Sequence, residues 1–137
     1  MITINDRDTI ELTVPARAEY VRIVRLVMAG ITNSLGFNVE EIDDMKTAVG
    51  EAYNMFHPSE DHPLLVCTSV DARRIVVEIT QQSNQAAVPR FFPMDSGMEK
   101  GIGLILLKHL MDEVEYKTGS TETHIRLVKN RHVAPTP

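Results

Sequence analysis

The sequence predicts a single α/β domain, a two-layer sandwich in which three helices cover one face of a largely antiparallel or mixed sheet. The chain has 137 residues, of which 43% are hydrophobic and 24% charged, a balance that suits one globular domain with its own core. Strand-like and helix-like patterns follow one another in the order β-α-α-β-β-α-β-β. Because neighbouring strand patterns are joined by short turns, paired antiparallel strands should dominate the sheet.

Alternation of apolar and polar residues, or apolar residues at steps of three and four, predicts each element. The predicted strands cover residues 10–14, 64–70, 75–80, 113–118 and 121–128, and the predicted helices cover residues 20–35, 38–57 and 101–111. Gly36 should end the first helix, and Pro15 should break the first strand. Asn38 followed by Glu41 has the form of a capped helix start.

Two segments lack a regular pattern. Residues 81–99 contain two prolines and a glycine and predict a long loop. Residues 129–137 end in Pro-Thr-Pro and predict a disordered tail. We therefore expect one domain spanning residues 1–128.

Charge and cysteine content exclude several classes of protein. The net charge of −5 and the scattered Lys and Arg residues disfavour nucleic-acid binding. The single cysteine, Cys67, cannot form an internal disulfide or a thiolate cage, and its place in a strand favours a buried, inert thiol. No apolar run is long enough to span a membrane, and the polar start does not have the form of a signal peptide. These features predict a cytoplasmic protein.

The second predicted helix carries the first candidate chemistry. Glu51 and Asn54 lie on its polar side, far from the apolar stripe. A solvent-facing polar surface explains both residues. Alternatively, the carboxylate could accept a proton and the amide could help to hold Mg²⁺, which needs few protein ligands beside phosphate and water.

Two further segments are candidates for ligand contacts. Gly101 and Gly103 precede and open the third predicted helix, where backbone N–H groups could approach a phosphate. Tight packing explains such a pair of glycines equally well. The predicted strand 75–80 runs into an amide-rich segment that contains Gln81, which is most simply a polar loop.

Residues 8–128 resemble the anti-sigma serine kinases of the general-stress and sporulation type, which belong to the same ATPase superfamily as histidine kinases. Three segments carry the resemblance: ELTVPARAEYVRIVRLVMAGI, EEIDDMKTAVGEA and GIGLILLKHLMDEVEY. The resemblance implies the Bergerat-type histidine-kinase-like ATPase fold. It also implies ATP or ADP with Mg²⁺ as cofactor, and a sigma factor and an anti-anti-sigma protein as partners of a homodimer.

The nucleotide motifs depart from the family pattern. The family motif E-x-x-x-N-x-x-x-H is shortened by two residues here, so Glu51 matches the catalytic base while Asn54 matches the Mg²⁺ ligand only approximately. Gln81 replaces the aspartate that reads adenine, and its neutral amide could bind adenine only more weakly. Gly101 and Gly103 match the second glycine box. Met55 and its neighbour Phe56 fall where residues are missing, and a bulky side chain turned inward there could occupy the nucleotide space.

Three functions follow from this pattern. The first, which we favour, is a regulator that binds a sigma factor, an anti-anti-sigma protein or both, with impaired or absent ATP binding and kinase activity. The second is an active kinase that phosphorylates its antagonist on serine, with Glu51 as base. The third is a nucleotide-binding regulator that transfers no phosphate. Arg22, on the side of the first helix away from its apolar stripe, is a candidate partner contact in all three cases, and an exposed solubilising arginine is the alternative.

Overall fold

The computed structural model describes residues 7–82 and 94–131, with side chains described everywhere in these ranges except at residues 94–100. The strands are β1 (Thr9–Ala16), β2 (Ser59–Val70), β3 (Arg74–Gln82), β4 (Glu113–Thr118) and β5 (Glu122–Asn130). The helices are α1 (Val21–Ser34), α2 (Val39–Asn54) and α3 (Met94–Leu110), with a short 3₁₀ turn at Ala18–Tyr20. None of the described helices is long and apolar enough to cross a membrane.

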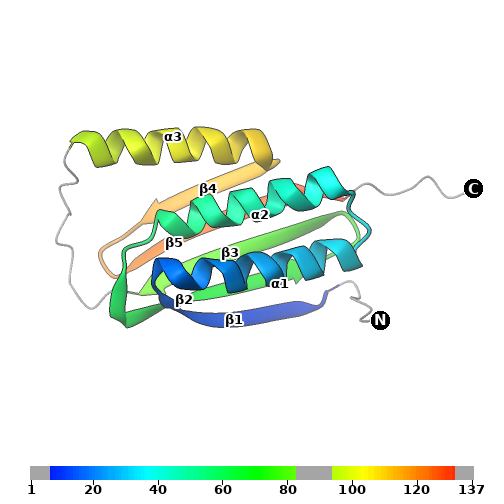
Figure 1. The fold of residues 1–137 in the computed structure, drawn as a ribbon, viewed down its shortest axis with the longest axis horizontal. Coiled ribbons are helices and arrows are strands. Elements are labelled where there is room, and N and C mark those ends of the chain that lie inside the picture. Colours follow the sequence, from blue (N-terminus) through cyan, green and yellow to red (C-terminus); the bar gives the residue numbers. More distant parts are fainter. Residues whose placement is uncertain (1–6, 83–93, 132–137) are drawn as a thin grey trace, which may run out of the picture.

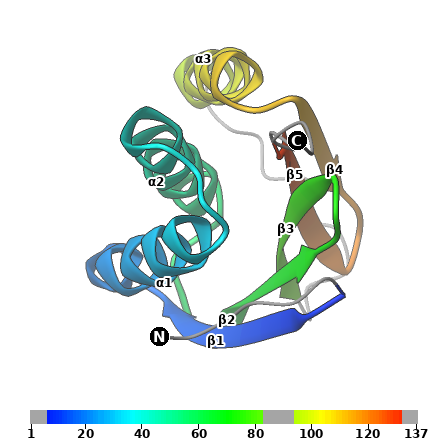
Figure 2. The same cartoon turned by 90° about the vertical axis from the view of Figure 1, so that its right-hand side faces the viewer.

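The five strands form one sheet in the order β1-β2-β3-β5-β4, and all four strand pairs are antiparallel. Figures 1 and 2 show the three helices on one face of this sheet, with α2 between α1 and α3. The core lies between the two layers, because strand residues that face the helices are apolar and buried in alternation with polar residues on the open face. The predicted two-layer α/β class is confirmed.

The ends of the first two helices form as the sequence predicts. The Asn38 side chain accepts a hydrogen bond from the Glu41 N–H (2.8 Å), and the Glu41 carboxylate accepts one from the Asn38 N–H (3.1 Å). This reciprocal capping box satisfies two backbone donors at the start of α2. Gly36 follows α1 with a φ of +83°, a left-handed conformation that glycine adopts without steric cost.

Several predicted boundaries need correction. The first strand continues through Pro15 to Ala16, because an edge strand tolerates proline at an irregularity, and the register shifts there. The last strand continues to Asn130, where it still pairs with β3, so the predicted boundary at residue 128 falls inside β5. The predicted tail beyond residue 131 lies outside the described residues.

The third helix starts at Met94, seven residues before its predicted start. Met98, Glu99 and Lys100 are good helix formers, and they outweigh the glycines, each of which costs a helix about 1 kcal/mol. Of the long loop predicted over residues 81–99, Gln81 and Gln82 belong to β3, and residues 83–93 lie outside the described residues.

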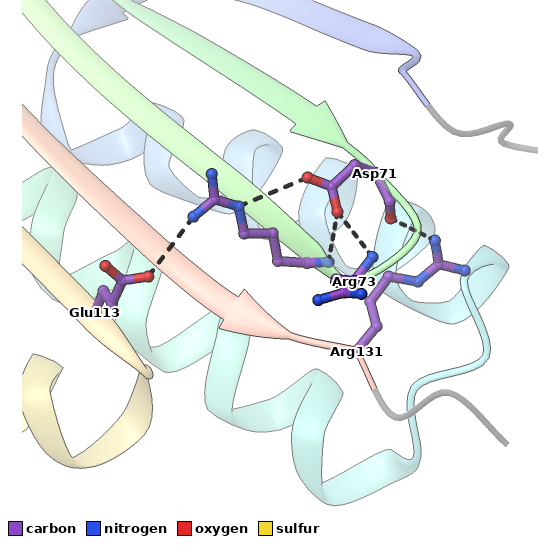
Figure 3. Close-up of polar contacts among 5 residues, drawn as sticks. Asp71, Arg73, Glu113 and Arg131 are labelled. Atoms are coloured by element: carbon purple, nitrogen blue, oxygen red, sulfur yellow. Dashed lines mark hydrogen bonds and ion pairs between the residues drawn. The ribbon is translucent and has the colours of Figure 1, made fainter. Parts of the chain in front are cut away.

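The turn between β2 and β3 is held by polar contacts at the end of the sheet (Figure 3). The Asp71 carboxylate accepts hydrogen bonds from the N–H groups of Arg73 (2.7 Å) and Arg74 (2.9 Å). The Arg74 guanidinium lies between Asp71 and Glu113 of β4, at 3.6 and 3.7 Å. The Arg131 side chain donates to the Asp71 carbonyl oxygen (2.7 Å). This hydrogen bond joins the turn between β2 and β3 to the residue that follows β5.

Acidification should weaken this turn. Hydrogen bonds from the N–H of Arg73, and then of Arg74, hold the pKa of Asp71 below its usual 3.8. The Asp71 carboxylate therefore stabilises the fold above about pH 4, and this stabilisation is lost as the pH falls through the lower folded-state pKa. In urea unfolding between pH 7 and 3, the wild type should lose stability more steeply below pH 4 than Asp71→Asn, which keeps the acceptor but has no charge to titrate. Identical profiles would contradict this assignment.

Candidate functional site

The predicted site residues lie where the end of α2, the end of β3 and the body of α3 come together. Two hydrogen bonds between Gln81 and His57, one in each direction, join the end of β3 to the segment that follows α2. Gly103 of α3 faces Met55, which caps the C-terminal end of α2. The fold therefore brings together the segments that contain Glu51, Gln81 and Gly103.

Gln81 is buried, with 7% of its surface exposed, and its amide contacts protein backbone. Its Nε2 donates to the carbonyl oxygens of His57 (2.7 Å) and His62 (3.1 Å), while its Oε1 accepts from the His57 N–H (3.3 Å). Both amide protons are thus used, and one acceptor site of the oxygen is used as well. The side chain that stands in place of the family's adenine-reading aspartate thus ties the end of α2 to β2 and β3.

The end of α2 turns two large side chains inward. The N–H of Met55 bonds to Ala52 O (3.1 Å) and that of Phe56 bonds to Tyr53 O (3.2 Å), the spacing of a tightened last turn. Met55 and Phe56 are only 8% and 6% exposed, and both belong to the core. Both large side chains of this segment are therefore turned into the core, which is one of the two possibilities that the shortened motif leaves open.

The Met55 side chain extends from the end of α2 toward α3, on the side of α3 where Gly103 lies. Its sulfur is 3.8 Å from the place where a Cβ on Gly103 would stand, so the Met55 side chain faces this glycine and a methyl group added there would just reach the sulfur. In the family motif an asparagine stands four residues after the glutamate, and four residues after Glu51 is Met55. A thioether is a weak acceptor and a poor ligand for Mg²⁺, which prefers oxygen.

Glu51 and Asn54 differ in their surroundings within the described part of the chain. Glu51 is half-buried, and no hydrogen bond or ion pair of its carboxylate occurs in the described part of the chain. Asn54 is exposed and borders a hollow of about 100 Å³ on the β1 side of α2, with Arg17, Tyr53 and His57. No residue of α3 with a described side chain lines this hollow with Asn54.

Tyr53 forms the inner wall of that hollow and ties α2 to the end of β1. Its hydroxyl donates to the carbonyl oxygens of Pro15 (2.7 Å) and Arg17 (2.9 Å). Burial, as the largest cause, raises the pKa of Tyr53. A neutral hydroxyl held by two carbonyl oxygens is a structural contact, so this hollow has a fixed wall.

Gly101 and Gly103 lie inside α3 and do not open it, which corrects their predicted position. Only the first four N–H groups of a helix lack an intrahelical partner, and here these belong to the turn that starts at Met94. The N–H groups of the two glycines are therefore used within the helix. The predicted phosphate contact through a helix N-terminus does not match this geometry.

Taken together, these residues do not fit ATP with Mg²⁺. The amide of Gln81 is hydrogen-bonded to backbone, Asn54 borders the hollow at the end of β1, and the buried Met55 side chain faces Gly103. Gln81 and Gly103 line neither the hollow beside Asn54 nor the wider hollow on α1 that is described next.

Arg22 is exposed on α1 and borders a second, wider hollow of about 500 Å³ with Glu19, Ile23 and Arg25. Ile23 and Leu26 expose 44% and 65% of their surfaces on the same helix. The predicted exposure of Arg22 is confirmed, whereas a role in partner binding stays a prediction.

One contact that the sequence did not indicate joins α1 to α2. A Cβ placed on Gly50 would come within 2.7 Å of Arg25 Nε, so the guanidinium lies directly over the Gly50 backbone. Glycine at this position lets the arginine cross α2 beside Glu51. The sequence does carry one signal for this contact, the lone glycine inside a helical pattern. Such a glycine often marks a place where another part of the protein approaches the helix backbone closely.

Cys67 lies on the open face of the sheet, half-buried, which corrects the expectation that it is buried. Its direct neighbours on the flanking strands are Glu11 and Glu78. Desolvation and then these two carboxylates raise the pKa of the Cys67 thiol, which supports the expectation that it is inert. Within residues 7–82 and 94–131, no three His, Cys, Asp or Glu side chains are placed to hold a metal ion.

Comparison with known proteins agrees with this architecture. Residues 14–129 match the model of the histidine kinase-like ATPase domain. The chain is 33% identical over 132 residues to the serine-protein kinase RsbW of Halalkalibacterium halodurans, covering 85% of this chain and 80% of that protein. It is 31% identical over 134 residues to the serine-protein kinase RsbW of Bacillus subtilis, covering 87% and 84%.

A solved structure shares the fold. The crystal structure of the RsbU and RsbW domains of Rv1364c from Mycobacterium tuberculosis matches with a TM-score of 0.66 at 14% identity, over 89% of this chain and 31% of that longer chain. The family predicted from the sequence is confirmed. The chain therefore belongs to the family of histidine kinase-like ATPase domains that includes the RsbW serine-protein kinases.

Proposed function

We propose that this protein is an anti-sigma-type regulator of the cytoplasm that acts by binding partner proteins, with impaired or absent ATP binding and kinase activity. The observation that carries the proposal is the position of Met55, a buried side chain that faces Gly103. This apolar side chain fills the position where the family motif supplies the Mg²⁺ ligand. The partners we propose are a sigma factor, an anti-anti-sigma protein or both, bound to a homodimer.

The energetics of phosphoryl transfer support this choice. That reaction depends mostly on the positioning of phosphates, metal and nucleophile and on charge stabilisation. A misplacement of about 1 Å can cost about 100-fold in rate, and here Asn54 borders the hollow at the end of β1. Glu51 keeps the position of the base, and it is the observation that favours the second candidate, an active kinase.

The two candidates are separated by a transfer assay. Purified sigma factors and anti-anti-sigma proteins of the host are each mixed with the purified chain, and complexes are detected by size-exclusion chromatography. The same mixtures are then incubated with ATP labelled on its γ-phosphate and with Mg²⁺. Complex formation without label transfer is the expected result. Transfer of label to a serine of the antagonist, abolished in Glu51→Gln, would establish the kinase instead.

Replacing Arg22 by glutamate should weaken partner binding about tenfold or more if this exposed residue of α1 lies in the interface, because a reversed charge at a contact is costly. Affinities measured by calorimetry for the wild type and for Arg22→Glu check this. Arg73→Glu is the matched control, since Arg73 is exposed in the turn between β2 and β3. Equal affinities for all three proteins would remove Arg22 from the interface.

A further inference from the structure

The Gln81 carboxamide forms a reciprocal pair with one residue at the end of α2. It accepts from the N–H of His57 and donates to the carbonyl oxygen of the same residue, at 3.3 and 2.7 Å. A third hydrogen bond, to His62 O, anchors the amide to the start of β2. Since Gln81 is buried, water does not compete freely for these bonds.

This pair fixes the chain two residues after Met55. Between α2 and His57 the backbone makes a tightened turn through Met55 and Phe56. With His57 held at one end and the helix at the other, the turn has little freedom, and the Met55 side chain is directed at Gly103.

We propose that Gln81 is a positioning residue that holds Met55 against Gly103 and so keeps the space between α2 and α3 closed to a nucleotide. This inference rests on the proposed function, because it states how the site is kept closed in a protein that binds partners without nucleotide. It replaces the role of Gln81 as an adenine ligand. Without the amide, the turn after α2 opens locally and the thioether of Met55 becomes accessible to solvent.

Methionine oxidation measures that accessibility directly. The full chain is treated with dilute hydrogen peroxide, and sulfoxide formation at each methionine is followed by peptide mass spectrometry. Met55 is 8% exposed, whereas Met28 and Met45 are fully buried elsewhere in the core and report on global unfolding. In Gln81→Ala we expect Met55 to oxidise roughly tenfold faster than in the wild type, the change expected from losing about one net hydrogen bond of local stability. Met28 and Met45 should stay as slow as before.

Gln82→Ala is the matched control, because Gln82 is the exposed neighbour on the same strand. It should leave all three oxidation rates unchanged. Gln81→Glu keeps the acceptor for the His57 N–H but removes both donors, and it should expose Met55 as Gln81→Ala does. If Gln81→Ala does not yield folded protein, Gln81→Asn, which keeps the amide on a shorter side chain, enters the same comparison.

Two outcomes would overturn the inference. If Met55 in Gln81→Ala stays as protected as in the wild type, core packing alone holds it. If the oxidation rates of all three methionines rise together, Gln81 supports the fold as a whole and has no specific effect on Met55. Nucleotide binding by the wild type would instead contradict the proposed function, whatever the oxidation pattern. Failure of the inference about Gln81 and failure of the proposed function can therefore be told apart.

Discussion

Replacing Gln81 by leucine should lower the free energy of unfolding by about 2–4 kcal/mol, because three part-buried backbone groups lose their side-chain partner at once. These groups are the N–H and the carbonyl of His57 and the carbonyl of His62. A hydrogen bond contributes a net of about 0.5–1.5 kcal/mol, so the loss of three supports an effect of this size, and leucine has a similar size to glutamine but no hydrogen-bonding atom. Urea unfolding followed by circular dichroism measures the change.

The same substitution at the next residue provides the comparison. Gln82 is exposed, so Gln82→Leu should change the free energy of unfolding by less than about 0.5 kcal/mol. Equal effects at the two positions would mean that the backbone contacts of Gln81 contribute little to stability.

Shortening Met45 to alanine should cost about 2–5 kcal/mol. Met45 lies in the middle of α2, is fully buried and belongs to the core between helices and sheet. Truncation removes apolar contacts and leaves a cavity that the packed layers can refill only in part. Denaturant unfolding of the variant at neutral pH gives the value.

Val39 on the same helix is the matched control. It exposes 75% of its surface, so Val39→Ala should have a small effect, and the higher helix propensity of alanine could even stabilise α2 slightly. A loss at Val39 as large as that at Met45 would contradict the assignment of which face of α2 is buried.

The fold could be predicted from the sequence because each element carries a local signal. Asn38 and Glu41 marked the start of α2, and Gly36 marked the end of α1, where the left-handed backbone favours glycine. The start of α3 was missed because glycines weaken a helical pattern without excluding it. The last strand was predicted to end too early, at residue 128, because the pairing of Asn130 with Arg74 is a tertiary contact with no local signature.

The site was less predictable for a physical reason. Counting along the motif indicated that two residues are missing near Met55 and Phe56, but it left open whether a bulky side chain there turns inward. The partners of the Gln81 amide come from residues 19 and 24 positions away, and nothing in the local pattern specifies them. Which side of α2 Asn54 faces depends on how the helix ends, which is also a tertiary property.

The central claim is that the buried Met55 side chain, which faces Gly103, keeps nucleotide out, and calorimetric titration of the wild type with ATP, and with ADP, in the presence of Mg²⁺ tests it most directly. The RsbW kinase of Bacillus subtilis, titrated in parallel, is the comparison protein. We expect no saturable heat for this chain up to about 1 mM nucleotide, which corresponds to less than about 4 kcal/mol of binding free energy. Saturable binding with a dissociation constant in the micromolar range would contradict the account.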